Sequence, residues 1–368
     1  MLFGGRSAEH DVSRVTAVAV ARALDPARYE VVPVAITTEG KWLLAGEARA
    51  LLAGARDELP PAFAIEGAPV DLVTQPGGGE LVPFGGGAPL EPAGSRIDVV
   101  LPLLHGPYGE DGTIQGLLDT VGLPYVGAGV LGSAVGMDKV MMKRAFLACG
   151  LPTPRFLPLR DGDDVAAFCA RVEDELGLPC FVKPANMGSS VGVSKAHDRA
   201  ELEAAIAQAF AFDEWLLAEE AVTGREIEVA VLGDDPPEAS VAGEVVPGAE
   251  FYDYADKYED GRAQLLAPAP LGEALAADVR ALALRAFEAC RCEAMARVDF
   301  FFEETGPSRG FLLNELNTIP GFTPISMYPR LWQESGLSYA QLIDRLIGLA
   351  LERHDRRVRR AGRQRPGR

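Results

Sequence analysis

The fold is decided by one stretch, Asn314-Glu315-Leu316-Asn317-Thr318-Ile319-Pro320-Gly321, read together with the earlier Arg297-Val298-Asp299. In each stretch, two polar residues stand at positions i and i+2 of an otherwise apolar run. In a β-strand this spacing puts both side chains on one face. The connecting segment Glu303 to Arg309 predicts a hairpin turn between the two strands. If the strands pair, two carboxylates, an amide and a guanidinium converge on one polar patch.

This patch is rich in oxygen ligands. Carboxylate and amide oxygens at such density suit Mg²⁺, which keeps part of its coordination shell for the phosphates of a substrate. The alternative is a pair of half-exposed strands whose charges are simply solvated.

The composition is that of a folded chain with more than one domain. At 368 residues it is long enough for two or three domains, and 48% hydrophobic residues allow a sizeable core. No apolar run reaches the roughly 18 residues of a membrane span, and no charged and apolar leader stands at the N-terminus. We therefore expect a cytoplasmic protein without membrane contact. The five cysteines are odd in number and lack C-x-x-C spacing, which favours buried free thiols over disulfides or a zinc site.

The charge is strongly acidic and unevenly placed. A net charge of -18 argues against nucleic acid as the main partner, because phosphate binding needs a basic surface. Residues 353–368 nevertheless carry eight Arg and one Asp. Such a run predicts a solvated, disordered basic tail, with a weak polyanion contact as the alternative.

Apolar runs alternate with helical patterns along the chain, which indicates an α/β architecture. We place domain boundaries near Val126 and near Thr223. At the N-terminus, Met1-Leu2-Phe3 looks too short for a strand, although Gly4 to Ser7 resembles a turn into a helix that begins near Asp11. Either the first strand is truncated or the true start codon lies upstream.

Two glycine patterns suggest other functions but lack their context. Gly127 to Gly132 fits G-x-G-x-x-G, the dinucleotide-binding pattern, yet the acidic residue expected about twenty positions later is missing from Ala145 to Arg160. Gly188 to Gly192 fits the G-x-S-x-G turn of esterases, which must lead into a helix. Here Val191 to Val193 instead predicts another strand.

Lys183 to Val193 is better interpreted as a strand, a loop of small residues and a return strand. Glycine and serine let backbone amides approach phosphate oxygens, and Lys183 supplies a point charge at the strand end. No G-x-x-x-x-G-K-[S/T] pattern occurs, so a P-loop is excluded. The alternative is an ordinary hairpin turn.

Leu217 to Glu226 leaves one strand for a linker and enters another. Backbone edges in such a linker can bind an adenine while Glu226 takes ribose hydroxyls. A simple solvated linker is the alternative.

Four motifs, taken in their order along the chain, resemble those of the ATP-grasp fold: Lys183 to Val193, Glu219 to Glu226, Arg297 to Asp299 and Glu315 to Gly321. Further blocks resemble the D-alanine:D-alanine ligase family, and the resemblance covers residues 2 to 350. These blocks are Phe3-Gly4-Gly5-Arg6-Ser7-Ala8-Glu9-His10, His105-Gly106-Pro107-Tyr108-Gly109-Glu110-Asp111-Gly112, Met137-Asp138-Lys139, Phe251-Tyr252-Asp253-Tyr254-Ala255-Asp256-Lys257-Tyr258 and Pro320 to Pro329.

The resemblance implies a three-domain ATP-grasp fold: a parallel α/β domain at the N-terminus and two α+β domains that sandwich ATP. The expected segments are 1–126 with the first D-alanine site, 127–222, 223–352 with the metal site and a mobile loop, and the basic tail 353–368. The implied reaction has two steps, in which ATP phosphorylates one D-alanine and the amine of a second attacks the acyl phosphate. The product would serve peptidoglycan synthesis, and the protein would be a homodimer.

The resemblance also implies roles for individual residues. The ATP-binding residues would be Lys139, Lys183, Ser190 and Phe251 together with Glu219, Glu220, Val222 and Glu226 around the nucleoside. The ligands of two Mg²⁺, for which Mn²⁺ may substitute, would be Asp299, Glu315 and Asn317. The residues that stabilise the oxyanion would be Arg297 and the amide of Gly321. The residues that bind the two D-alanines or close the site would be Glu9, Ser189, Tyr258, Lys257, Ser326 and His105. The alternative for His105 is that it only satisfies the hydrogen bonds of a buried turn.

Two alternatives to dipeptide synthesis stay open. A ligase of the same family could use D-lactate or D-serine as its second substrate, although the ester-forming relatives lack the loop Phe251 to Tyr258. A catalytically silent ATP-binding protein could keep the fold. Against the silent protein, every expected metal and phosphate ligand is present.

Overall fold

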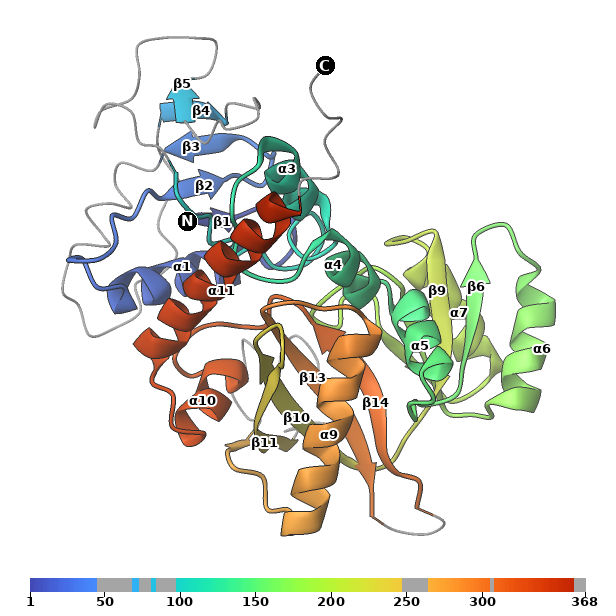
Figure 1. Ribbon diagram of the computed structural model, residues 1–368. Coiled ribbons are helices and arrows are strands. Elements are labelled where there is room, and N and C mark those ends of the chain that lie inside the picture. The colour runs from blue at the N-terminus through green and yellow to red at the C-terminus, as the bar shows by residue number, and fades with distance from the viewer. Residues whose placement is uncertain (45–67, 73–80, 84–96, 247–263, 305–307, 361–368) are drawn as a thin grey trace.

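Three β-sheets follow one another along the chain, each with helices packed on it (Figure 1). The computed structural model describes residues 1–44, 68–72, 81–83, 97–246, 264–304 and 308–360. In this part of the chain, no helix is both long and apolar enough to cross a membrane. The α/β architecture expected from the alternation of apolar runs is confirmed.

The N-terminal sheet has the order β1-β2-β3-β4-β5. Strands β1 and β2 are parallel, whereas the pairs β2–β3, β3–β4 and β4–β5 are antiparallel. The expected parallel pairing holds for β1 with β2 and for the bridges Leu2–Pro102 and Val100–Tyr125, whereas β3 to β5 extend the sheet with antiparallel strands. The elements are β1 Leu2–Gly4, α1 His10–Ala23, β2 Val34–Ile36, β3 Trp42–Leu44, β4 Ala68–Leu72, β5 Leu81–Pro83 and α3 Thr113–Val121.

The first strand forms despite its length. Leu2 to Gly4 pair with β2, and the amide of Leu2 donates to the carbonyl of Leu101 at 3.0 Å. Phe3 is buried in the main core. Gly4 has φ +88°, and a Cβ there would lie 2.3 Å from the carbonyl oxygen of Ile36, so only glycine fits. The prediction that Met1 to Phe3 is too short for a strand is wrong.

The central sheet is built from four strands in the order β6-β9-β7-β8. Apolar residues of α6 and α7 pack against it and form a separate core. Helices α4 and α5 connect this sheet to the N-terminal domain. The elements are α4 Val130–Met137, α5 Lys139–Ala148, β6 Phe156–Arg160, α6 Val165–Glu175, β7 Cys180–Pro184, β8 Ser194–Ala196, α7 Arg199–Ala209 and β9 Trp215–Glu220.

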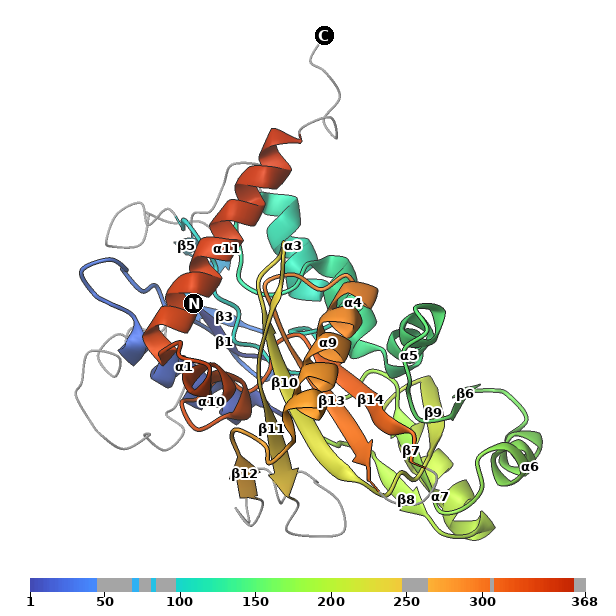
Figure 2. The same ribbon diagram turned by 60° about the horizontal axis from the view of Figure 1, so that its bottom comes forward.

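The C-terminal sheet is antiparallel, in the order β12-β11-β10-β13-β14. Along β10, Val229 and Val231 pack with α9, whereas Ala230 and Leu232 pack with α10 and α11, so helices cover both faces. Figure 2 shows α9 lying across the sheet. The elements are β10 Arg225–Leu232, β11 Glu238–Val246, β12 Gln264–Leu266, α9 Glu273–Ala289, β13 Met295–Glu303, β14 Gly310–Asn317, α10 Met327–Glu334 and α11 Tyr339–Arg359.

The glycine pattern 127–132 serves packing. It lies at the start of α4, which rests on the chain at 291–293. A Cβ at Gly129 would lie 2.6 Å from Oε2 of Glu293, and one at Gly132 would lie 2.9 Å from the carbonyl oxygen of Arg291. Close contact between these two segments explains Gly129 and Gly132, so a dinucleotide site is not needed to explain the pattern.

The last helix corrects the prediction of a basic disordered tail. Helix α11 continues to Arg359 and runs beside α1 along the N-terminal domain (Figures 1 and 2). Arg353 is only 3% exposed and donates to the carbonyl oxygens of Gly127 at 2.5 Å and Tyr125 at 2.6 Å. The prediction failed at Arg353 because the density of charge in the sequence does not show that this side chain donates to buried backbone carbonyls. Residues 361–368 lie outside the described part of the chain.

We expect Arg353→Ala to lower the free energy of unfolding by about 3 kcal/mol, because two buried carbonyls lose their donor. Urea unfolding measures the change. Arg359→Ala, an exposed change on the same helix, is the matched control and should stay within about 0.5 kcal/mol of the wild type. Equal stability of the two variants would contradict the anchoring role of Arg353.

Candidate active site

A cavity of about 540 Å³ lies between the central and the C-terminal sheets. Its walls come from the β7–β8 loop, the linker between β9 and β10, the start of α5 and the β13–β14 hairpin. Many of the residues singled out from the sequence line it together. These are Lys139, Lys183, Ser189, Ser190, Val222, Glu226, Arg297, Asp299, Glu315 and Asn317.

The β13–β14 hairpin brings its polar residues together as predicted. In the antiparallel register, Arg297 stands opposite Asn317, and Asp299 stands opposite Glu315. The guanidinium of Arg297 donates to both oxygens of Asp299, at 2.8 and 2.7 Å. The amide nitrogen of Asn317 donates to Asp299 Oδ2 at 2.9 Å. Burial opposes the charge of Arg297, but Asp299 and the neighbouring Glu228 outweigh it and hold its pKa well above the usual value.

This hairpin is also the candidate metal site. Asp299, Glu315 and Asn317 offer two carboxylates and an amide on one wall of the cavity. Within the described ranges, no group of three or more His, Cys, Asp or Glu side chains is placed to hold a metal ion by itself. A divalent ion here would therefore need further oxygen ligands from water or phosphate. This mixed, oxygen-only set fits Mg²⁺ or Mn²⁺ better than zinc.

The loop after β7 forms the opposite wall. Ser189 and Ser190 have φ of 47° and 59°, a left-handed conformation that is costly for serine and frequent at functional sites. The return strand β8 begins at Ser194, so the prediction that it begins at Val191 is wrong. The loop leads into a strand rather than a helix, which excludes the esterase turn. Beside it, Lys139 Nζ donates to the carbonyl oxygen of Met187 at 2.5 Å.

Glu219 lies behind this wall and binds two lysines. Lys183 Nζ contacts Glu219 Oε1 at 2.6 Å, and Lys143 Nζ contacts Oε2 at 2.5 Å. Burial alone would raise the pKa of Glu219, but attraction from both lysines lowers it. The carboxylate predicted to surround the nucleoside is thus engaged in ion pairs and does not line the cavity.

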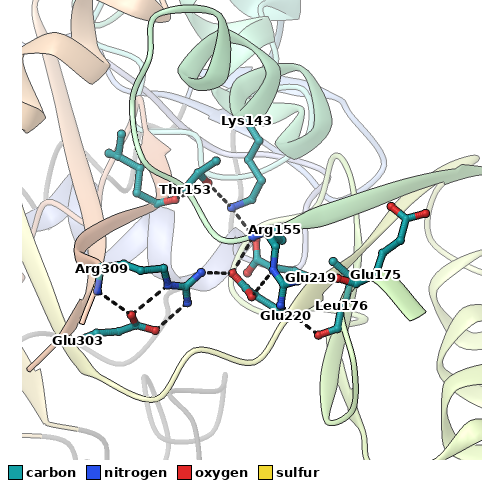
Figure 3. Close-up of polar contacts among 10 residues, drawn as sticks. Lys143, Thr153, Arg155, Glu175, Leu176, Glu219, Glu220, Glu303 and Arg309 are labelled. Carbon is teal, nitrogen blue, oxygen red and sulfur yellow. Dashed lines mark hydrogen bonds and ion pairs between the residues drawn. The ribbon is translucent and has the colours of Figure 1, made fainter. Parts of the chain in front are cut away.

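Glu220 is turned away from the cavity as well. Its carboxylate accepts from Arg155 Nε at 2.8 Å and from Arg309 Nη1 at 2.5 Å (Figure 3). Arg309 also binds Glu303, so these residues join the end of β9 to the base of the hairpin. The Glu220 side chain therefore does not line the cavity, whereas Val222 and the rest of the linker do.

A second cluster joins the N-terminal domain to the serine loop. The hydroxyl of Ser189 donates to Glu9 Oε1, although the two residues are 180 positions apart. His105 is 4% exposed, and its Nδ1 lies 3.0 Å from the carbonyl oxygen of Ile319. In the described part of the chain, its Nε2 has no hydrogen-bond partner. The three side chains are therefore held where the N-terminal domain meets the cavity.

Four further residues predicted from the sequence do not line the cavity or lie outside the described residues. Ser326 lies next to Gly321, since a Cβ on that glycine would be 3.2 Å from Ser326 Oγ, and neither residue lines the cavity. Lys257 and Tyr258, like the predicted ATP contact Phe251, lie outside the described residues.

Glu110 lines the cavity but is not among the site residues predicted from the sequence. Its carboxylate accepts from the amides of Gly106 at 2.7 Å and Ile319 at 3.0 Å. Burial first, and then repulsion from Glu9, raise its pKa to about 8. The available signal was an acid within the glycine-rich block that follows His105.

Glu110 gives a pH-dependent contribution to stability. Its pKa rises from 4.5 in the unfolded chain to about 8 in the folded protein. The folded protein therefore binds the proton more tightly, so this contribution is full below pH 4.5 and is lost as the pH rises towards 8. We expect the free energy of unfolding to fall more steeply from pH 5 to pH 8 in the wild type than in Glu110→Gln. Parallel curves from urea unfolding would contradict this assignment.

Two sheets thus enclose a cavity lined by lysines, a small-residue loop and an acidic hairpin, which is the arrangement expected from the resemblance to the ATP-grasp fold. Residues 1–128 match the family described as D-ala D-ala ligase N-terminus, and residues 145–348 match D-ala D-ala ligase C-terminus. The chain belongs to the D-alanine–D-alanine ligase family.

Individual relatives agree with this placement. The D-alanine–D-alanine ligase of Geobacillus thermodenitrificans (strain NG80-2) is 47% identical over 96% of this chain and 95% of the relative. That of Thermoanaerobacter sp. (strain X514) is 47% identical over 98% of both chains.

Among solved structures, the D-alanine-D-alanine ligase from Coxiella burnetii has a TM-score of 0.81 at 35% identity, covering 97% of this chain and 96% of its own. The VanG D-Ala:D-Ser ligase from Enterococcus faecalis has a TM-score of 0.81 at 32% identity, and the match covers 95% of this chain and 98% of that ligase.

Proposed function

We propose that this chain uses ATP to join two D-alanines into D-alanyl-D-alanine through a D-alanyl phosphate. The family assignment supports the overall reaction. The observation that carries the residue assignment is the cavity itself, where Lys183 and the serine loop face the Asp299–Glu315 hairpin. A triphosphate between these walls would have cations on one side and metal ligands on the other.

In the first step, Lys139, Lys183 and the loop containing Ser189 and Ser190 hold the phosphates of ATP. Backbone groups of the linker at Val222 bind the adenine, and Glu226 binds the ribose. Asp299, Glu315 and Asn317 would hold two Mg²⁺, which offset the charge of the phosphates and orient the γ-phosphate. The carboxylate of the first D-alanine then attacks that phosphate and ADP leaves.

In the second step, the amine of the second D-alanine attacks the acyl carbon and phosphate leaves. The guanidinium of Arg297 and the amide of Gly321 stabilise the oxyanion that develops there. Glu9 pairs with the ammonium of the first D-alanine, and Ser189 fixes the Glu9 carboxylate through the hydrogen bond described above. His105 orients the same substrate through its unpartnered Nε2.

The remaining roles concern the second substrate and the cell. Lys257 and Ser326 would bind its carboxylate, and Tyr258 would close the loop over the site through Ser189 and Glu9. We place the reaction in the cytoplasm, where it supplies dipeptide for peptidoglycan, and we propose a homodimer. None of these assignments depends on nucleic acid or on a membrane.

The choice of second substrate is tested by competition, because a solved relative at 32% identity is a D-Ala:D-Ser ligase. Labelled D-alanine is incubated with ATP and equimolar unlabelled D-serine and D-lactate at pH 6 and pH 8. The attacking amine must lose a proton whereas D-lactate enters with a neutral hydroxyl, so the preference for dipeptide over ester should grow with pH. We expect D-alanyl-D-alanine to predominate at pH 8. A predominance of D-alanyl-D-serine or of the ester would overturn the assignment.

A further inference from the structure

Lys143 is a buried lysine to which the proposed mechanism gives no role. It comes from α5, is 1% exposed and does not line the cavity. Lysine is almost never buried to this extent unless it is paired. Its Nζ contacts Glu219 Oε2 at 2.5 Å and Thr153 Oγ1 at 3.1 Å (Figure 3). It also donates to the carbonyl oxygen of Asn314 at 3.1 Å.

Glu219 stands between Lys143 and the cavity lysine. Its other oxygen, Oε1, contacts Lys183 Nζ at 2.6 Å, and Lys183 forms part of the cavity wall. One carboxylate is thus shared by two ammonium groups, which leaves the cluster with one net positive charge. Without Lys143, the charge of Glu219 would cancel that of Lys183. In a buried cluster such a change acts over a low effective dielectric and is large.

We propose that Lys143 is a positioning residue that balances Glu219, so that Lys183 keeps a net positive charge towards the phosphates of ATP. The inference rests on the proposed function in taking ATP as the ligand of the cavity. The same ammonium also ties three elements together. It contacts Glu219 on β9 and the carbonyl oxygen of Asn314 on β14 from its own place on α5.

The test compares ATP with adenosine in the full-length protein, with dissociation constants from calorimetric titration in the presence of Mg²⁺ and the absence of D-alanine. Lys143→Met should weaken ATP binding roughly tenfold or more and leave adenosine binding within about twofold, because only ATP carries the phosphates that Lys183 binds. Equal weakening of both ligands, or no change in either, would overturn the proposal.

A double variant separates charge balance from a general loss of structure. Lys143→Met combined with Glu219→Gln removes both buried charges and leaves Lys183 with its own. The ratio of the adenosine to the ATP dissociation constant should return to within about threefold of the wild type. This variant also carries the test if Lys143→Met alone does not fold, since it removes the buried Lys143–Glu219 ion pair as a whole rather than one partner of it. A ratio that stays depressed tenfold would refute charge balance.

Thr153→Val is the matched structural control. It removes a hydrogen-bond partner of Lys143 and the bond from Thr153 Oγ1 to the carbonyl of Leu313 at 2.7 Å, but it alters no charge. In Thr153→Val, the ratio of the adenosine to the ATP dissociation constant should stay at the wild-type value. A decrease in this ratio equal to that in Lys143→Met would overturn the proposal. These measurements need no turnover. A wild type that binds ATP but forms no dipeptide would refute the proposed function and leave the binding comparison valid.

Discussion

Glu315→Gln should lower the rate of ATP-dependent ligation by on the order of a thousandfold while the protein stays folded. Glu315 lies opposite Asp299 across the hairpin and lines the cavity. In the proposed function its carboxylate would help to hold two divalent ions, and a neutral amide would not offset the mutual repulsion of those ions. Initial rates over a titration of Mg²⁺ measure the effect, and melting curves check the fold.

Glu304→Gln provides the matched control for that measurement. It makes the same acid-to-amide change near the turn of the same hairpin, where Glu304 is half exposed and paired with Arg225 at 2.9 Å. Its rate should equal that of the wild type. If Glu315→Gln also retained the wild-type rate at saturating Mg²⁺, Glu315 would have no part in the site.

Glu9→Gln should raise the KM for the first D-alanine by about a hundredfold and leave the affinity for ATP unchanged. The physical reason is that a charge-assisted bond to an ammonium is lost in a nearly closed site, where Glu9 is only 9% exposed. Steady-state kinetics at saturating ATP, with nucleotide binding measured separately, resolve the two effects.

Asp11→Asn is the corresponding control on helix α1. Asp11 is exposed and pairs with Arg14 at 2.7 Å, away from the cavity. Asp11→Asn should leave both the KM for the first D-alanine and the affinity for ATP unchanged. Weakened ATP binding in Glu9→Gln would show that this residue supports the fold rather than the first substrate.

The hairpin was predictable because its information is local. Alternation of polar and apolar residues fixes which side chains of β13 and β14 share a face, and a short turn fixes the pairing. Asp299 and Glu315 therefore stand opposite each other as the pattern required. The strand, linker and strand around Val222 were predictable for the same reason.

Other features depend on partners that are distant in sequence. Charge density suggested that Arg353 belongs to a solvated tail, yet it binds carbonyls 226 and 228 positions away. Glu220 follows Glu219 directly, but each faces a different set of cations because successive side chains of a strand point to opposite sides. For Lys143, the sequence holds one signal that could have linked it to the cavity: it stands four residues after Lys139, at the start of the same helix.

Ligation through an acyl phosphate can be tested with D-alanine that carries ¹⁸O in both carboxylate oxygens. The protein is incubated with this D-alanine and ATP, and mass spectrometry determines the label in the released phosphate and the amount of dipeptide. We expect one ¹⁸O in each phosphate and one D-alanyl-D-alanine for each phosphate released, because the oxygen that attacks the γ-phosphate leaves with it. Phosphate without label, or labelled phosphate without dipeptide, would contradict it.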